Sequence, residues 1–296
     1  MPPASLPLLA LALCLSLPAA LSAAEVEAPA NDDQQYGWDH DGRVGLFLNS
    51  ILIDNAEQSR DPSITSSEQT VAWTAAFDGA LDWTAPYQAL EQTLELKFGQ
   101  QKQDDQAWFE SNDLIEYDGV YKALFQRPRY VYGAWSATSV FTGPEPREDP
   151  FDPLLVAASA GYGEQHSSRE QIEEEPRWSL DLRLGVRAQR RFSPNADSRD
   201  LEWEFGPEGL VSFQARPHTT VGYELRYEVF SEFGDLGHVT HLFTASATIA
   251  VATYVDIDLD LRAYYEGEPE DAPADAGGYD EIAVRQETLI GIVYSF

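Results

Sequence analysis

Sulfur is almost absent from this sequence of 296 residues, which has one cysteine, Cys14, and one methionine, Met1. Because Cys14 lies within an apolar leader, the chain after the leader has no thiol. This excludes a cysteine nucleophile, a disulfide framework and a zinc–thiolate site. Positive charge is also scarce, with 19 Lys and Arg against 50 Asp and Glu and a net charge of −31. Such a charge repels phosphate groups and argues against nucleic acid as a partner.

Long apolar runs are missing everywhere except at the start of the chain. Residues 6–21 are apolar or small, and residues 22–24 (Ser-Ala-Ala) supply the small side chains that a signal peptidase reads. We therefore predict a Sec-type signal peptide over residues 1–24, followed by a short polar segment over residues 25–42. No later stretch reaches the roughly 18 apolar residues of a membrane helix.

From residue 43 onward the chain alternates between apolar and polar residues with a period of two, which predicts β-strands. The alternation is clearest in residues 178–188, where Trp, Leu and Val share one face and Ser, Asp and Arg the other. We count twelve such segments, near 43–53, 71–83, 89–98, 111–125, 130–141, 155–166, 178–190, 201–213, 219–230, 241–251, 254–265 and 282–296. Globular strands average about five or six residues, whereas a strand tilted across a bilayer needs about nine to eleven. Residues 43–296 are therefore predicted to form an all-β, transmembrane antiparallel barrel of about twelve strands.

The connections between these segments also alternate, between short and long. Short turns are expected at 84–88, 126–129, 214–218 and 252–253, and long polar loops at 54–70, 99–110, 142–154, 191–200, 231–240 and 266–281. Connection 167–177 is long where a short turn is expected. Short periplasmic turns and long outer loops are typical of outer-membrane barrels, so we predict a bacterial outer-membrane location with both ends of the barrel chain on the short-turn side.

The last segment carries spaced aromatic residues after a glycine, with Gly291, Tyr294 and Phe296 as the key positions. It resembles the carboxy-terminal signal of outer-membrane barrels, although Leu289 stands where such signals usually have a polar residue. This resemblance implies the barrel assembly machinery as a partner.

Two further stretches resemble uncharacterised outer-membrane barrel families. One runs from Leu-Glu-Leu-Lys-Phe-Gly at 94–99 through residues 112–122, and the other from Phe-Asp-Pro at 151–153 to Ser-Ala-Gly-Tyr-Gly at 159–163. The chain is also similar to the salt-stress-induced barrels of Gram-negative bacteria. The resemblance covers roughly residues 71–165. It implies a single outer-membrane barrel and no particular substrate.

Charged residues of both signs fall on the faces opposite the apolar ones. If the apolar faces meet lipid, the lumen receives these charges, and we take as candidate pore-lining residues Asp256, Asp258, Asp260, Arg262, Arg183 and Arg187. The three aspartates would form a negative ladder that selects cations. The alternative is a narrow or closed lumen, filled by ion pairs between neighbouring strands.

Two other features resemble functional sites, but we do not predict either to be one. His166 and Ser168 are spaced like the His-x-Ser of outer-membrane lipid hydrolases, but the Asn-Gly that usually follows is absent and the pair falls at the periplasmic rim. The acidic loop 266–281 offers hard oxygen ligands, but its spacing fits no ordered ion-binding loop. We therefore predict no catalytic residue, no specific metal site and no cofactor, with only diffuse divalent cations at the acidic loops.

These observations favour a porin-like, non-enzymatic barrel that acts in envelope integrity or in passive passage of small solutes, with cations preferred. Its partners would be outer-membrane lipid and lipopolysaccharide. Two alternatives stay open: a lipid hydrolase that uses His166 and Ser168, and an adhesin or receptor that binds through the long loops.

Overall fold

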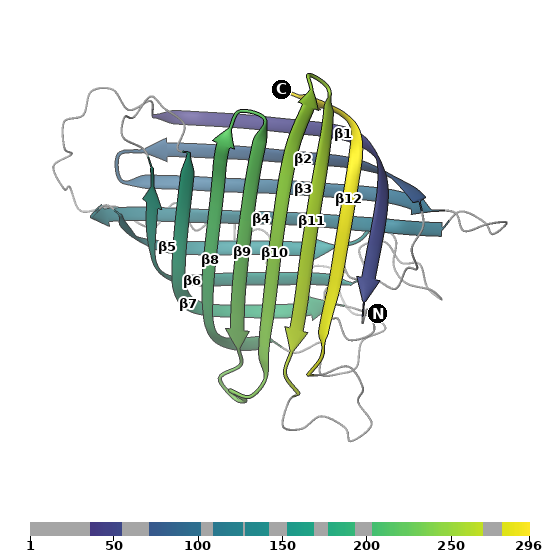
Figure 1. Ribbon diagram of the computed structural model, residues 1–296. Coiled ribbons are helices and arrows are strands. Elements are labelled where there is room, and N and C mark those ends of the chain that lie inside the picture. Colours follow the sequence, from purple (N-terminus) through teal and green to yellow (C-terminus); the bar gives the residue numbers. More distant parts are fainter. Residues whose placement is uncertain are drawn as a thin grey trace, which may run out of the picture. The chain divides into compact units, whose positions relative to one another are not determined.

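The computed structural model describes residues 36–54, 71–101, 109–126, 128–141, 153–168, 177–192, 203–268 and 280–296 (Figure 1). The predicted signal peptide lies outside the described residues. The twelve strands are β1 (Gly37–Asp54), β2 (Val71–Ala85), β3 (Gln88–Gln101), β4 (Phe109–Gln126), β5 (Arg129–Ser139), β6 (Leu154–Ser167), β7 (Trp178–Phe192), β8 (Glu204–His218), β9 (Val221–Ser231), β10 (Val239–Ala252), β11 (Val255–Glu266) and β12 (Ile282–Ser295). Each predicted segment corresponds to one of these strands.

The strands pair antiparallel with their sequence neighbours, and β1 pairs with β12 to close the sheet into a barrel. The predicted twelve-stranded antiparallel barrel is therefore confirmed. In Figure 1 the strands β9–β12 of the near wall cross β2–β4 of the far wall at a steep angle, as expected because strands tilt when a sheet closes on itself. Among the described residues, no helix is long or apolar enough to span a membrane.

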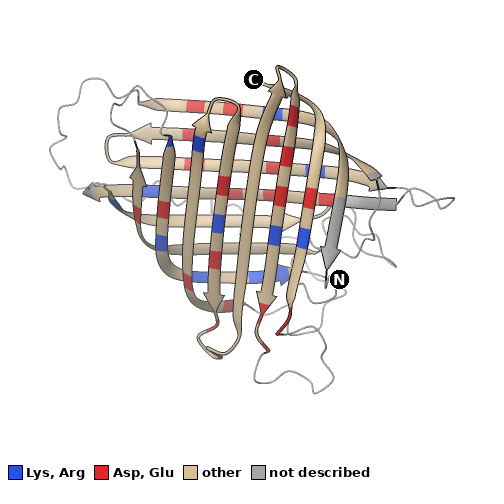
Figure 2. Ribbon diagram, viewed as in Figure 1, with Lys and Arg blue, Asp and Glu red and all other residues tan. Residues whose placement is uncertain are grey.

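The two faces of the sheet differ sharply in polarity. On β7, Leu184 is 71% exposed on the outside of the barrel, whereas Asp181 on the inner face is 8% exposed. Figure 2 marks where the acidic and basic residues fall along the strands. The barrel thus presents apolar side chains outward and encloses charge, the reverse of a water-soluble domain.

The two ends of the barrel differ in their connections. One end, here called the turn end, carries tight turns at residues 86–87, 219–220 and 253–254, and the loop end is the opposite one. The turn expected at 214–218 instead belongs to β8. The pairing of β8 with β9 shifts register between Ala215 and His218. Pro217, which has no N–H to donate, therefore lies outside the regular ladder of hydrogen bonds, and the strand continues past it.

Strand β1 begins at Gly37, ahead of residue 43 where the sequence alternation starts. Trp38 lies opposite Trp83 in the β1–β2 ladder, and the two indole rings contact each other with centroids 6.4 Å apart. This pairing draws residues 37–42 of the expected polar segment into the sheet.

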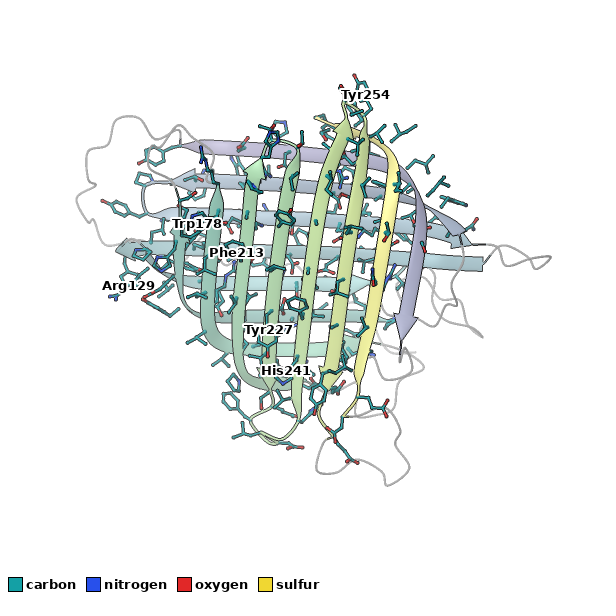
Figure 3. All side chains as sticks on the ribbon, viewed as in Figure 1. Arg129, Trp178, Phe213, Tyr227, His241 and Tyr254 are labelled. Atoms are coloured by element: carbon teal, nitrogen blue, oxygen red, sulfur yellow. The ribbon has the colours of Figure 1, made fainter. Side chains whose placement is uncertain are left out.

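Aromatic side chains gather near both ends of the strands. Ring pairs near the turn end are Trp38–Trp83, Phe125–Tyr162 and Tyr294–Phe296, and those near the loop end are Trp73–Phe98, Trp203–Phe205 and His241 with Tyr227 and Tyr265. Figure 3 shows the separation, with Tyr254 by one tight turn and Tyr227 and His241 toward the other end. Two such bands match the aromatic girdles at the two interfaces of a membrane.

The β1–β12 seam is closed at the turn end by residues of the predicted carboxy-terminal signal. The Gly42 and Phe296 amides each donate to the other's carbonyl at 2.9 Å. Tyr294 and Phe296 stack with ring centroids 6.0 Å apart. A side chain at Gly291 would collide with the β1 backbone at Leu46 and with the Phe47 side chain, so only glycine fits this close approach.

Candidate functional site: the charged lumen

The barrel encloses a cavity of about 1010 Å³ that reaches the turn end. Its lining includes ten acidic residues, Asp41, Asp78, Glu95, Glu116, Asp118, Glu224, Glu228, Asp258, Asp260 and Glu287. The basic residues of the lining are six, Arg43, Lys97, Arg216, Arg226, Arg262 and Arg285. We call this space the vestibule. Its excess of carboxylates gives it a negative character.

Two ion pairs cross the interior between strands that are far apart in the sheet. Lys97 on β3 lies with its Nζ 3.2 Å from an Asp260 carboxylate oxygen on β11, although three strands separate β3 from β11 around the barrel. Arg262 on β11 likewise reaches Glu116 on β4 at 3.3 Å. Opposite walls of the barrel are therefore in contact through their charged side chains.

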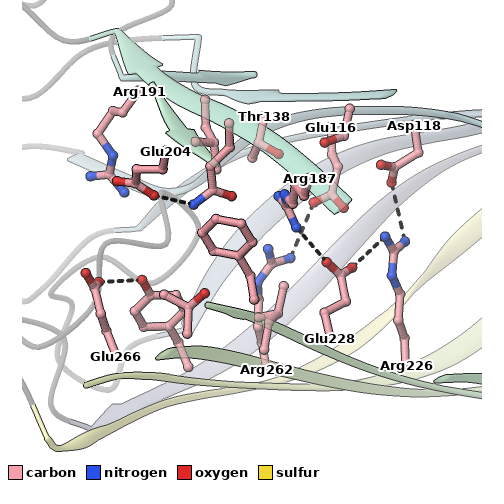
Figure 4. A pocket seen from close by; sticks show the side chains of 17 residues that line it. Glu116, Asp118, Thr138, Arg187, Arg191, Glu204, Arg226, Glu228, Arg262 and Glu266 are labelled. Carbon is pink, nitrogen blue, oxygen red and sulfur yellow. Dashed lines mark hydrogen bonds and ion pairs between the residues drawn. The ribbon is translucent and has the colours of Figure 1, made fainter. Parts of the chain in front are cut away.

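A second group of charges extends this contact toward β9. Arg226 on β9 reaches Asp118 on β4 at 3.5 Å and also binds Glu228 at 2.5 Å. Glu228 in turn binds Arg187 of β7 at 3.2 Å (Figure 4). We call the eight residues of these two groups the ion-pair belt, namely Lys97, Asp260, Glu116, Arg262, Asp118, Arg226, Glu228 and Arg187.

The ion-pair belt divides the interior. On its turn-end side lies the vestibule, whose lining continues to Asp41 and Ser295. On its loop-end side lies a cavity of only about 120 Å³, lined by belt residues together with Gln189, Glu204 and Glu266. The ion-pair belt therefore lies between a large cavity and a small one.

The predicted negative ladder on β11 faces the interior, but basic residues partner it. Arg43 on β1 binds Asp258 at 2.6 Å and Asp256 at 3.1 Å, and Lys97 binds Asp260. One arginine thus faces two carboxylates, so the ladder keeps negative charge. Arg43 was not among the expected pore residues, and no local pattern marks it as their partner because it lies 213 residues away from Asp256.

The remaining predicted pore residues lie in different places. Asp258, Asp260 and Arg262 line the vestibule, and Arg187 belongs to the belt. Arg183 lines a smaller cavity of about 200 Å³ and binds Asp181 at 2.7 Å. Asp256 binds Arg43, which lines the vestibule. Of the six expected residues, five therefore lie at the belt or beside the vestibule, and Arg183 belongs to a separate network of side chains in the barrel wall.

That wall network joins β3, β4, β5 and β7. Asp181 accepts a hydrogen bond from the Tyr130 hydroxyl and lies 3.3 Å from the Lys122 ammonium, which also binds Glu91 at 2.7 Å. Tyr130 fits because Gly163 has no side chain, since a Cβ there would collide with the tyrosine ring. Lys122 is 1% exposed.

Replacing Lys122 with methionine should lower the free energy of unfolding by about 1–3 kcal/mol, because buried Asp181 loses one of its two cationic partners and keeps only Arg183, while the partly exposed Glu91 loses its ammonium partner. Unfolding of the refolded barrel in denaturant measures the change. Arg129→Gln, which breaks an exposed pair with Glu164 on the outer surface, is the control and should alter stability far less. Equal losses in both variants would contradict a structural role for Lys122.

The expected lipid-hydrolase pair is not assembled as a catalytic site. His166 is exposed, and its Nε2 lies 3.6 Å from Glu164. The Ser168 hydroxyl oxygen accepts a hydrogen bond from the Trp178 amide at 3.0 Å, which joins the end of β6 to the start of β7. No hydrogen bond joins the His166 and Ser168 side chains within the described part of the chain.

Only the edges of the acidic loop 266–281 can be placed, because residues 269–279 lie outside the described residues. Glu266 is buried and accepts hydrogen bonds from the Tyr264 hydroxyl at 2.6 Å and from the His238 ring at 2.8 Å. No group of three His, Cys, Asp or Glu side chains within the described ranges is arranged to hold a metal ion.

His238 ties the β9–β10 loop to the end of β11. Its Nδ1 faces Glu232 at 3.5 Å and its Nε2 faces Glu266, so both ring nitrogens meet a carboxylate. The hydrogen bond to Glu266 raises the pKa of His238 above its ordinary value of about 6.5. Nearby Glu204 raises the pKa of His238 further.

The contacts of His238 with Glu232 and Glu266 predict that the stability of the β9–β10 loop depends on pH. Because the folded pKa of His238 is raised, its stabilisation is fully present below the unfolded pKa and is lost as the pH rises through the folded pKa. Hydrogen exchange of residues 232–238 should therefore speed up as the pH rises, beyond the ordinary chemical acceleration. His238→Gln should remove this dependence; a dependence that persists in the variant would contradict the assignment.

Comparisons with known proteins give similar solved structures only. No protein-family model and no curated protein matches the sequence at a significant level, so the resemblance to particular uncharacterised families stays a prediction. An anion-selective porin from Comamonas acidovorans is 10% identical, with a TM-score of 0.36 over 88% of this chain and 100% of that one. An outer membrane channel from Pseudomonas putida F1 is 14% identical, with a TM-score of 0.39 over 91% and 100%. The NanC porin is 6% identical, with a TM-score of 0.40 over 83% and 98%. At these scores and identities the similarities do not assign a function.

Proposed function

We propose that this chain is a bacterial outer-membrane barrel that allows passive passage of small solutes, with a preference for cations. The outward apolar face and the two aromatic bands support the membrane location, because exposed leucine and valine side chains are stable against lipid and costly against water. The alternation of tight turns and long connections supports an orientation with the turn end in the periplasm.

The observation that carries the proposal is the vestibule of about 1010 Å³ together with the ion-pair belt, whose side chains cross the interior. A charged and solvated interior is suited to water and small ions, and a belt made only of side chains can yield without unfolding the sheet. Larger solutes would be held back at the belt. The expected permeability is therefore low and size-restricted.

The preference for cations is supported by acidic residues near the turn-end mouth. Asp39 lies directly opposite Asp82, and Asp82 directly opposite Glu91, so three carboxylates share one row across β1, β2 and β3, with Lys122 of β4 bound to Glu91. Like charges placed opposite one another cost stability. Their negative field would concentrate cations at this mouth.

Single-channel recording in a planar bilayer tests the proposal. The refolded chain without residues 1–24 should give small conductance steps, and a salt gradient should give a reversal potential of cation-selective sign. A barrel shown to be folded by its resistance to denaturant that gives no conductance, or one that prefers anions, would overturn the proposal.

The other partners and roles are proposals as well. The paired seam at Phe296 is consistent with recognition of the last strand by the barrel assembly machinery. No specific contact favours a lipid hydrolase, and alanine at His166 or Ser168 would have to abolish activity on phospholipid or lipid A to support it. An adhesin or receptor role concerns loops that lie mostly outside the described residues.

A further inference from the structure

Arg190 is a basic side chain on the outer surface of the barrel near the loop end. Its neighbours Gln189 and Arg191 line the interior cavity beside the belt, so alternation places Arg190 on the opposite, outward face. It follows the exposed series Leu182, Leu184 and Val186 along β7. A cation on this face would meet lipid or lipid headgroups rather than the lumen.

Aromatic rings hold the Arg190 guanidinium in place. Its Cζ lies 4.7 Å from the centre of the Phe192 ring and 5.9 Å from that of Trp203. Trp203 in turn contacts Phe205, with ring centroids 6.3 Å apart. A guanidinium packed against ring faces can still donate hydrogen bonds in its own plane through its terminal Nη–H groups, whereas the Nε of Arg190 is buried.

Arg190 has no anionic partner among the described residues, and its Nε is buried without a hydrogen bond. The outward-facing Arg129 near the turn end provides a contrast, because its Nε donates to Glu164 at 3.2 Å. A cation on the lipid-facing surface is costly unless an anion pairs with it. None of the described residues supplies this anion, so the partner of Arg190 has to come from beyond them.

We propose that Arg190, with Phe192 and Trp203, binds the phosphate group of an outer-leaflet lipid. The aromatic band at the loop end lies at the depth of lipid headgroups, and guanidinium binds phosphate with two parallel hydrogen bonds. In an outer membrane the phosphate-bearing lipid of that leaflet is lipid A, to which we commit. This inference rests on the proposed outer-membrane location and orientation, but it does not depend on passage through the lumen.

Native mass spectrometry of the refolded barrel in detergent micelles tests the site. The wild-type chain should retain phosphorylated lipid A, and Arg190→Gln should weaken the apparent affinity about tenfold or more. Arg190→Lys, which keeps the charge but loses the planar two-bond geometry, should lie between them. Arg129→Gln is the matched control and should bind like the wild type.

Two comparisons identify the ligand. Lipid A stripped of its phosphates should bind the wild-type chain as weakly as phosphorylated lipid A binds Arg190→Gln, and millimolar inorganic phosphate should not displace the intact lipid. Equal binding of the stripped lipid, efficient displacement by free phosphate, or undiminished binding by a folded Arg190→Gln barrel would each overturn the inference. The readout is lipid retention and does not depend on conductance. A barrel that binds lipid A but does not conduct ions would therefore refute the proposed solute passage and leave the lipid site standing.

Discussion

Removing Glu116 and Arg262 together, as Glu116→Ala with Arg262→Ala, should raise the single-channel conductance several-fold. The two side chains meet at 3.3 Å across the lumen between β4 and β11. Deleting both removes a crossing contact without leaving either charge unpaired, so the sheet is expected to keep its closure. The interior would then widen where this contact now crosses it.

The matched control for this variant is Arg285→Ala with Glu287→Ala. These residues form an ion pair at 3.1 Å, but both lie on β12, so the pair does not cross the lumen. The control removes the same charges from the interior and should leave conductance near that of the wild type. An equal increase in both variants would show that lost charge, rather than the lost crossing contact, sets the conductance, and no increase in either would place the constriction elsewhere.

Replacing Asp256, Asp258 and Asp260 together with asparagine should remove most of the cation preference and move selectivity toward anions. These carboxylates do not stand alone, because Arg43 binds the first two and Lys97 the third. Neutralising them therefore takes away three negative charges and also leaves two cations without these partners. The change in the local potential is that of three negative charges, and Arg43 and Lys97, which then keep only Asp78 and Glu95 as partners, make this part of the wall less negative.

The reversal potential in a salt gradient measures this change. Lys97→Gln is the opposing variant, since it removes a cation from the same region and should strengthen the preference for cations. If neither variant changes the ion selectivity, residues outside β11 set it, for example the row formed by Asp39, Asp82 and Glu91.

Much of the fold could be predicted because strand alternation is a local property. Residues 178–188 alone reveal which side chains of β7 face inward, and the lengths of the connections reveal which end of the barrel each strand approaches. The errors also have local causes. Trp38 is drawn into β1 by Trp83 on the next strand, and Pro217 is accommodated by a register shift that no period of two can reveal.

The candidate site could be predicted only in part. Alternation places Asp260 and Arg262 inside the barrel, but it does not say which residue of the opposite wall each one meets. That depends on the tilt of the strands and on the width of the closed barrel, which together bring Lys97 and Glu116 within reach. The outward position of Arg190 follows from alternation, whereas its lack of an anionic partner among the described residues needs the three-dimensional arrangement.

The ion-pair belt has a consequence for the order in which the barrel assembles. Lys97 and Asp260 are 163 residues apart, Glu116 and Arg262 are 146 apart, and Asp118 and Arg226 are 108 apart. Contacts at such separations form late, because the intervening chain must first be ordered. The belt is therefore expected to form after the hairpins and to slow unfolding more than it speeds folding. Until the belt forms, its charged side chains are expected to stay hydrated, because an unpaired charge is costly away from water.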